Sequence, residues 1–153
     1  MKITSSIEYA TRLVVALGKF HSAEAVSSKK LAEIENIPAD FVDQILMHLR
    51  RAGLVKSQRG AGGGYVLALS PSKIKLGDIL RGMNGRIFDD VCEKYQSGKR
   101  ECGRHGSCAI SPVWKKLGVL IEDYLDSVTV EDLMGEKTSC AQVLSSPTAE
   151  AVQ

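Results

Sequence analysis

Apolar residues recur at helical spacing through the first third of the chain. The first stripe lies in a helix expected over residues 5–20 and consists of Ile7, Ala10, Val14 and Leu17. Intervals of three and four residues place these side chains on one face of a helix. A second, shorter helix is expected from Ser27 or Ser28, either of which can cap it, to residue 36. Its inward-facing residues are expected to be Leu31, Ala32 and Ile34.

A third helix is predicted to begin at Pro38, because proline is favoured in the first turn of a helix. Its buried stripe is expected to consist of Phe41, Val42, Ile45, Leu46 and Leu49. The other face carries Ala39, Asp40, Asp43, Gln44 and Met47, followed by His48, Arg50 and Arg51. Two helices joined by a tight turn form the helix-turn-helix pattern, whose second helix presents side chains to base edges.

The helical pattern ends at Ala52 and Gly53. Two strand-like runs, residues 54–57 and 65–69, flank a segment in which four of seven residues are glycine. This arrangement predicts a β-hairpin with a long tip, in other words a wing, where Gly62 and Gly63 let the backbone approach a surface closely. A nucleotide-phosphate loop is disfavoured, because no Lys-Ser/Thr follows the glycines and they lead into a strand rather than a helix.

The second half of the chain is predicted to contain a short helix around residues 77–81 and a long helix that begins at Pro112. The apolar stripe of the long helix consists of Val113, Leu117, Leu120 and Tyr124, widened by Trp114, Ile121 and Leu125. A small domain leaves little for this stripe to pack against, so pairing with a second copy is favoured over an intrachain core. Thr129 is expected to cap a final short helix together with Asp132.

The expected fold is therefore mainly α with a small β-hairpin. Residues 1–84 would form a winged helix-turn-helix DNA-binding domain, and residues 85–111 a cysteine-rich segment. Residues 112–134 would form the dimerisation helix and the short terminal helix, and residues 135–153 a disordered tail. A chain of 153 residues with 44% apolar composition is long enough to bury a core of this size.

The position of the charged residues, rather than the net charge, supports DNA binding. The net charge is only +2, but no acidic residue lies between Asp43 and Asp78. This interval holds a basic strip that consists of Arg50, Arg51, Lys56 and Arg59. A duplex backbone is the natural partner of such a strip on a recognition helix and a wing. No secretory or membrane-spanning segment is apparent, so a cytoplasmic location is expected.

Three of the four cysteines, Cys92, Cys102 and Cys108, fall within seventeen polar and glycine-rich residues. Such a segment offers no apolar face that would bury thiols, which favours a soft inorganic centre. An iron–sulfur cluster is the favoured interpretation, because the gaps are longer than those of zinc knuckles. A zinc site that also uses His105, and a thiol-redox switch, stay open as alternatives. The fourth cysteine, Cys140, lies in the tail and is interpreted as an incidental thiol.

The chain resembles the winged-helix iron–sulfur transcription regulators of the IscR, NsrR and RirA family, from Met1 to about Met134. The resemblance is carried by residues 1–4 and 8–10, by residues 49–55, by the wing sequence 59–65, and by the cysteine segment before the Trp114 helix. It implies a homodimer, held by the long helix, that binds a palindromic operator. It further implies base reading by Ala39, Asp40, Asp43 and Gln44, with Arg59 of the wing in the minor groove.

The resemblance also suggests how the cluster would be held. Some family members place a histidine three residues after the last cysteine, where this chain has Ser111. Others use an acidic residue on the first helix of the partner subunit, and Glu8 occupies that position. On its own, Glu8 reads as a first-turn carboxylate that favours the helix dipole. A relative with a two-iron cluster adds a histidine where this chain has Arg12. A 4Fe–4S cluster is therefore favoured, with 2Fe–2S as the alternative.

Overall fold

The computed structural model describes residues 3–20, 24–60, 62–88 and 108–135. The N-terminal part consists of α1 (Ser5–Lys19), α2 (Ser28–Glu35), α3 (Ala39–Arg51), β1 (Val55–Gln58) and β2 (Gly64–Leu67). A single 3-10 turn, η1 (Pro71–Lys73), leads into α4 (Leu76–Asn84). The C-terminal part consists of α6 (Ser111–Ser127) and α7 (Val130–Met134). The winged helix-turn-helix fold expected from the sequence is confirmed, whereas most of the predicted cysteine segment and tail lies outside the described residues.

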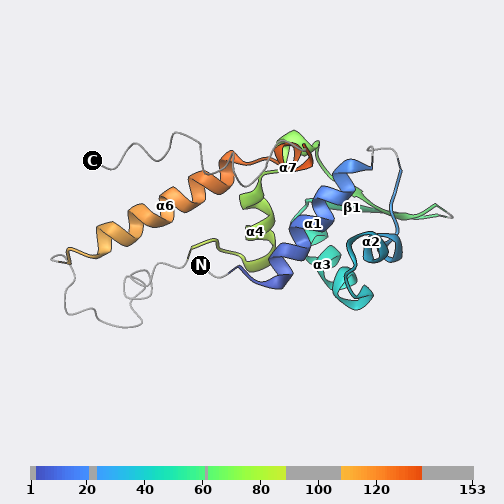
Figure 1. Ribbon diagram of the computed structural model, residues 1–153, viewed down its shortest axis with the longest axis horizontal. Coiled ribbons are helices and arrows are strands. Elements are labelled where there is room, and N and C mark those ends of the chain that lie inside the picture. Colours follow the sequence, from blue (N-terminus) through green and yellow to red (C-terminus); the bar gives the residue numbers. More distant parts are fainter. Residues whose placement is uncertain (1–2, 21–23, 61, 89–107, 136–153) are drawn as a thin grey trace.

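The core of the N-terminal part lies between α1, α2, α3 and the hairpin. Its most deeply buried side chains are Leu13, Val14, Leu31, Val42, Leu46, Leu49, Val55, Ile74, Ile79 and Val130. α7 packs against α1, so the end of the described chain closes the same core to which its beginning contributes (Figure 1). The expected capping box of α7 is present: the Thr129 hydroxyl accepts from the Asp132 N–H, and Asp132 accepts from the Thr129 N–H.

Two residues expected in the core lie at the surface. Phe41 is 49% exposed and Ile34 is 42% exposed. The buried stripe of α3 runs through Val42, Ile45, Leu46 and Leu49, and Phe41 lies about 100° around the helix from Val42. In the eight-residue α2, Leu31 is the side chain that is fully buried. The sequence pattern thus predicted both helices correctly but made their apolar faces too wide.

The wing is a two-stranded antiparallel hairpin in which Val55 pairs with Leu67 and Gln58 pairs with Gly64. The sequence did not predict a third contributor, Val26. It forms an antiparallel bridge with Tyr65, with N–H to carbonyl distances of 3.0 and 2.9 Å in the two directions. This bridge ties the start of β2, close to the wing tip, to the segment that enters α2, so the wing and the helix-turn-helix have a fixed relation.

α6 extends away from this body, and α4 lies between α6 and α1 (Figure 1). Gly118, Ile121 and Leu125 form its packed side, the last two beside a small cluster of Ile7, Leu80 and Ile87. Ile121 and Leu125 are expected from the sequence to widen the stripe that pairs with a second copy, but they face this cluster instead. The rest of the apolar stripe is left exposed.

Candidate nucleic-acid interface

The polar face of α3 points to solvent along its whole length. Every residue of this helix that the sequence assigned to DNA contact is exposed, namely Ala39, Asp40, Asp43, Gln44, Arg50 and Arg51. The face directly opposite the buried stripe is made by Asp40, Gln44, Met47 and Arg51, which follow one another at four, three and four residues. Met47 was not among the predicted contacts, although its position opposite Leu49 and Val42 could have identified it. This face combines hydrogen-bonding, charged and apolar groups, as base-edge reading requires.

The basic strip of Arg50, Arg51, Lys56 and Arg59 is exposed in the structure. Within the described ranges, none of these four side chains forms an ion pair with an acidic residue. Arg50 and Arg51 also lie in the last turn of α3, where the helix dipole favours positive charge. Their charge is therefore directed to solvent rather than balanced within the described chain, which suits contact with phosphates.

The glycines of the wing tip occupy their positions for different physical reasons. The Gly63 N–H donates to the Gly60 carbonyl at 2.9 Å, and Gly60 has a φ of 126°, a conformation that favours glycine. A Cβ on Gly63 would stand 2.7 Å from the Gln58 carbonyl oxygen. A Cβ on Gly62 would meet nothing within 4 Å. Gly63 therefore serves the turn itself, whereas Gly62 is exposed with open space around it.

Arg12 connects α1 to the end of α2. Its Nε donates to the Glu35 carboxylate at 2.9 Å, and its Nη2 donates to the Glu35 carbonyl oxygen. The guanidinium also lies 5.9 Å from the centre of the Tyr9 ring and 3.7 Å from the Glu8 carboxylate. Arg12 thus holds the helix-turn-helix against α1. Among the described residues, Glu8 makes only this long ion pair, and its side chain is 60% exposed.

The candidate metal ligands are only partly within the described chain. Cys92, Cys102, His105 and also Cys140 lie outside the described residues, whereas Cys108 is half-buried and lies three residues before the start of α6. Within the part that the structure describes, no three His, Cys, Asp or Glu side chains are grouped so that they could hold a metal ion. The start of α6 and the α1 helix that carries Glu8 lie well apart in one chain (Figure 1). Glu8 and Cys108 could therefore bind the same metal centre only if they came from two different chains.

The outward face of α6 is apolar. Its exposed large apolar side chains are Val113, Trp114, Leu117, Val119, Leu120 and Tyr124, preceded by Ile110. On a single chain these side chains face solvent over most of the 17-residue helix. An exposed stripe of this length at helical spacing is typical of a protein–protein interface.

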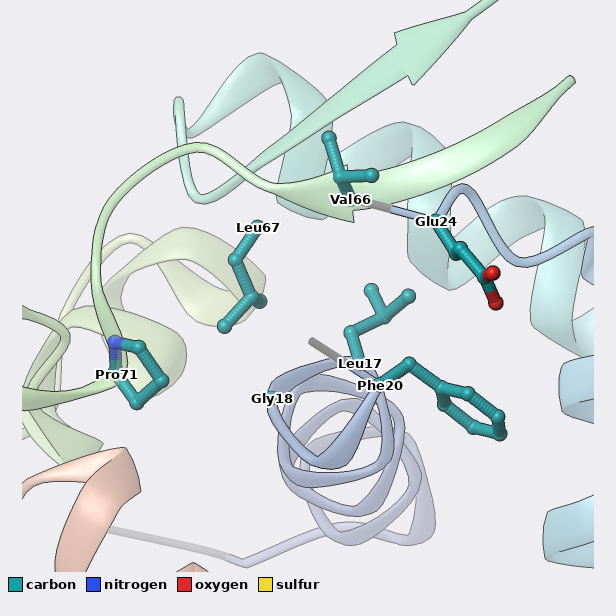
Figure 2. A pocket seen from close by; sticks show the side chains of 7 residues that line it. All are labelled: Leu17, Gly18, Phe20, Glu24, Val66, Leu67 and Pro71. Carbon is teal, nitrogen blue, oxygen red and sulfur yellow. The ribbon is translucent and has the colours of Figure 1, made fainter. Parts of the chain in front are cut away.

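Two hollows of the described surface lie beside the wing. Figure 2 shows the hollow between the end of α1 and β2, lined among others by Leu17, Phe20 and Leu67, whose volume of about 10 Å³ admits about one water molecule. A wider groove of about 450 Å³ between the end of α1, the start of α2 and the wing is open to solvent. Both border the wing rather than enclose a set of reactive side chains.

A comparison with protein families gives this geometry a context. A family model described as "Rrf2: Iron-dependent Transcriptional regulator" matches residues 3–136. The chain belongs to the Rrf2 family. Its resemblance to the winged-helix regulators of the IscR type is thereby confirmed, and so is the expectation of a transcriptional regulator rather than an enzyme.

One similar member of the Rrf2 family, CymR, is described as a global cysteine regulator. The chain is 37% identical to the HTH-type transcriptional regulator CymR of Bacillus subtilis, over 87% of this chain and 89% of CymR. The structure of that CymR, described as the global cysteine regulator of B. subtilis, has a TM-score of 0.69, with 36% identity over 88% of this chain and 96% of CymR.

Two other solved structures are similar. T. potens IscR has a TM-score of 0.66 and 33% identity, covering 93% of this chain and 91% of IscR. An oxidised form of Staphylococcus aureus CymR has a TM-score of 0.66 and 28% identity, covering 91% of this chain and 100% of CymR.

In the described part of this chain, no helix is both long and apolar enough to span a bilayer.

Proposed function

We propose that this Rrf2 regulator is a cytoplasmic homodimer that binds a palindromic operator in double-stranded DNA, with an affinity set by an iron–sulfur cluster on Cys92, Cys102 and Cys108. Regulation of transcription follows from the family. The DNA contacts, the dimer and the cluster are the proposal. The observation that carries it is the place of Cys108, which lies at the end of the cysteine segment and three residues before the exposed apolar helix α6.

The DNA-binding part of the proposal rests on the exposed face of α3 and on the wing. Ala39, Asp40, Asp43 and Gln44 would reach base edges in the major groove. Arg50 and Arg51 would contact the adjacent phosphates, while Arg59, Gly62 and Gly63 would bring the wing to the minor groove. The basic charge of this surface, which is not paired within the described residues, would supply the salt-dependent part of the affinity.

The dimer part rests on α6. Its exposed residues repeat at three and four positions, as the pairing of two antiparallel or crossed helices requires. Burying large apolar side chains stabilises an interface by about 25 cal/mol per Å² of apolar surface removed from water. Two copies related by a twofold axis would then present two α3 helices to two half-sites.

The spacing of the cysteines fits an iron–sulfur cluster better than a zinc site, because the gaps of nine and five residues are longer than those of zinc knuckles. Three thiols match the soft ligands that iron–sulfur clusters prefer, and Glu8 of the partner subunit would supply the fourth ligand. The exposed Glu8 side chain agrees with a ligand that reaches out from α1 to another chain. A carboxylate oxygen binds iron less strongly than a thiolate, which suits a cluster that responds to its surroundings. When bound, the cluster supplies reversible redox and ligand-exchange chemistry; a 4Fe–4S centre is favoured and a 2Fe–2S centre is the alternative.

The residues of the chain transmit the state of this site through two elements. Cys108 would hold the first turn of α6, and Glu8 would hold the first turn of α1. α1 is connected to the helix-turn-helix by Arg12 and Glu35, and α6 is connected to it through α4. A change in either attachment therefore alters the separation of the two recognition helices.

A second function is favoured by a specific observation. CymR of B. subtilis is described as a cysteine regulator, and S. aureus CymR has been solved in an oxidised form. The alternative is accordingly a regulator without a cluster that responds through its thiols, or one that is stabilised by zinc.

Anaerobic purification followed by iron, sulfide and zinc analysis separates these functions. We expect iron and sulfide in equal amounts together with visible absorption, all lost in Cys92→Ala, Cys102→Ala and Cys108→Ala. Cys140→Ala is the matched control and should keep the iron, the sulfide and the visible absorption. Operator binding is then measured on duplexes selected from a random pool, before and after the cluster is removed. A colourless protein without iron whose binding changes on oxidation would establish the thiol alternative instead.

A further inference from the structure

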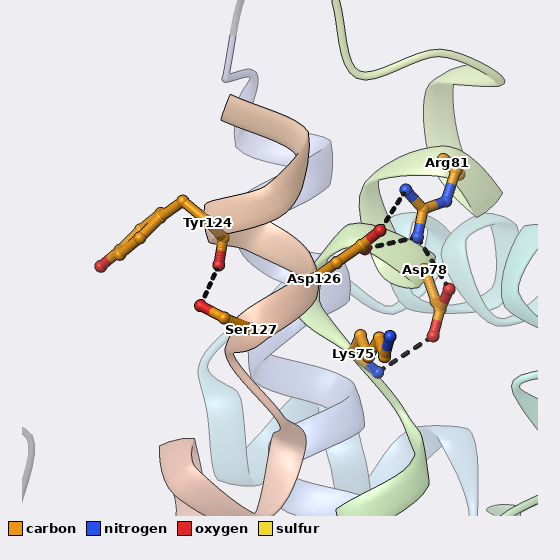
Figure 3. A network of polar contacts seen from close by, with 6 residues as sticks. All are labelled: Lys75, Asp78, Arg81, Tyr124, Asp126 and Ser127. Carbon is orange, nitrogen blue, oxygen red and sulfur yellow. Dashed lines mark hydrogen bonds and ion pairs between the residues drawn. The ribbon is translucent and has the colours of Figure 1, made fainter. Parts of the chain in front are cut away.

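The end of α6 is attached to α4 by a forked ion pair. Arg81 of α4 donates to both carboxylate oxygens of Asp126 on α6, at 2.6 Å from Nη2 and 3.3 Å from Nη1 (Figure 3). The Nη2 group also donates to Asp78 at 3.0 Å, and the other Asp78 oxygen accepts from the Lys75 N–H at the start of α4. The hydrogen bond to Asp126 raises the pKa of Arg81 above its usual value, with partial burial opposing it. A two-point contact between planar groups fixes orientation as well as distance.

The backbone around this ion pair is held as closely as the side chains. Gly77 is buried beneath Asp126, and a Cβ at this position would overlap the Asp126 Oδ1 and stand 3.1 Å from its Cγ. The Leu76 N–H donates to the Val128 carbonyl at 2.8 Å, and the Val130 N–H donates to the Ile74 carbonyl at 2.8 Å. The C-terminal end of α6 is therefore fixed to the start of α4, with no room to slide.

The angle that α6 makes at this joint determines where its far end lies. With 17 residues at about 1.5 Å each, α6 is about 25 Å long. Rotation of α6 by about 8° at the Arg81–Asp126 joint would move its far end by about 3.5 Å. That displacement matches the rise of one base pair, which is about 3.4 Å and is accompanied by a turn of about 35°.

We propose that the Arg81–Asp126 ion pair sets the half-site spacing of the operator, because it fixes the angle between the helix that joins the two subunits and the body that carries α3. The inference rests on the proposed function, in which α6 pairs with its twin. Arg81 and Asp126 are positioning residues: they contact no base and act through the separation of the two α3 helices. A rigid joint makes the dimer reject duplexes whose half-sites are one base pair closer or further apart, and a loosened joint makes it tolerate them.

The experiment uses the full-length protein and duplexes with two identical half-sites, selected first with the wild type. The Kd is measured as the spacer is varied by one and two base pairs in each direction. We expect the wild type to prefer one spacing over its neighbours by about tenfold. Arg81→Gln and Asp126→Asn should reduce that preference to about threefold or less, while the affinity for a duplex with a single half-site stays within about twofold. The double variant should be no broader than either single variant, since both remove the same contact.

Three further variants separate the joint from general damage. Asp123→Asn removes one charge from an exposed position of the same helix and should keep the wild-type preference. Gly77→Ala displaces Asp126 without removing any charge and should shift or broaden the preferred spacing. Arg81→Lys keeps the charge but loses the two-point contact, so it should give an intermediate preference even if Arg81→Gln folds poorly.

The outcomes distinguish this inference from the function on which it rests. If the wild type is a dimer with a sharp spacing preference, and Arg81→Gln, Asp126→Asn and Gly77→Ala all keep it, the joint does not set the spacing. If the wild type is monomeric, or binds paired and single half-sites equally, the dimeric regulator itself is wrong and the inference falls with it.

Discussion

Replacing Gly64 by alanine should loosen the wing where β2 begins, close to its tip. A Cβ on Gly64 would stand 2.5 Å from the Val26 carbonyl carbon and 2.8 Å from the Ser27 nitrogen, and it would overlap the Val26 carbonyl oxygen. These are backbone atoms, so no side-chain rotation can relieve the overlap. The segment around Val26 has to separate from β2, which breaks the bridge between Val26 and Tyr65.

The magnitude follows from what that bridge contains. Its two backbone hydrogen bonds, at 3.0 and 2.9 Å, each contribute about 1 kcal/mol net, so Gly64→Ala should lower the free energy of unfolding by about 2 kcal/mol. For a chain of this size, each kcal/mol corresponds to about 2–4 °C, which predicts a fall in Tm of about 4–8 °C. Thermal unfolding followed by circular dichroism measures this change directly.

Gly62→Ala is the matched control, since a Cβ there meets nothing within 4 Å. Its free energy of unfolding should stay within about 0.5 kcal/mol of the wild type. If the tip approaches the duplex as proposed, the same substitution should nevertheless weaken operator binding. Equal melting temperatures of the Gly64→Ala and Gly62→Ala variants would refute the argument from close packing at the start of β2.

Three further predictions concern charge. Arg59→Ala should make the plot of log Kobs for operator binding against log salt concentration less steep by about 1.8, which is 0.9 for each of two wings. An unchanged slope would show that Arg59 does not contact the DNA. Arg12→Ala should lower the free energy of unfolding in urea by about 1 kcal/mol, because Glu35 loses its partner while staying largely shielded from water; no loss would show that the contact is not maintained in solution. Hydrogen bonds from the Thr129 hydroxyl and then its N–H lower the pKa of Asp132, so the stability that this carboxylate adds is present above its unfolded pKa of about 3.9 and is lost as the pH falls through its lower folded value. The gap in unfolding free energy between the wild type and Asp132→Asn should therefore close below about pH 4, and a gap independent of pH would contradict this assignment.

Periodicity alone predicted the parts of this fold in which a single face decides the outcome. The stripe of Val42, Ile45, Leu46 and Leu49 follows from intervals of three, one and three residues, and it leaves Asp40 and Gln44 to solvent. The wing follows from two short runs around the glycines, and the cap of α7 follows from Thr129 and Asp132. Each of these features depends on neighbours in the sequence, so the sequence contains the information.

The features that were missed depend on contacts between distant segments. Nothing near Val26 indicates that it pairs with Tyr65, because an isolated bridge of one residue leaves no alternating pattern of apolar and polar residues in the sequence. Phe41 and Ile34 are apolar, but whether they are buried depends on where neighbouring helices cross. Likewise Ile121 and Leu125 belong to the same apolar stripe as Leu117, and only the position of α4 separates the inward residues from the outward ones.

The division of α6 into two faces explains how one helix can serve both association and control. Its inward side is fixed by Gly118, whose absent Cβ admits the Phe88 ring, and by Asp126, which Arg81 holds. Its outward side keeps large apolar groups that a second copy would cover. Cys108 lies three residues before the helix, so under the proposed function a rearrangement of the cysteine segment would act on the end of α6 furthest from the Arg81 joint. A shift of about 3.5 Å at that end would turn the 17-residue helix by about 8° about the joint, a displacement comparable to one base pair.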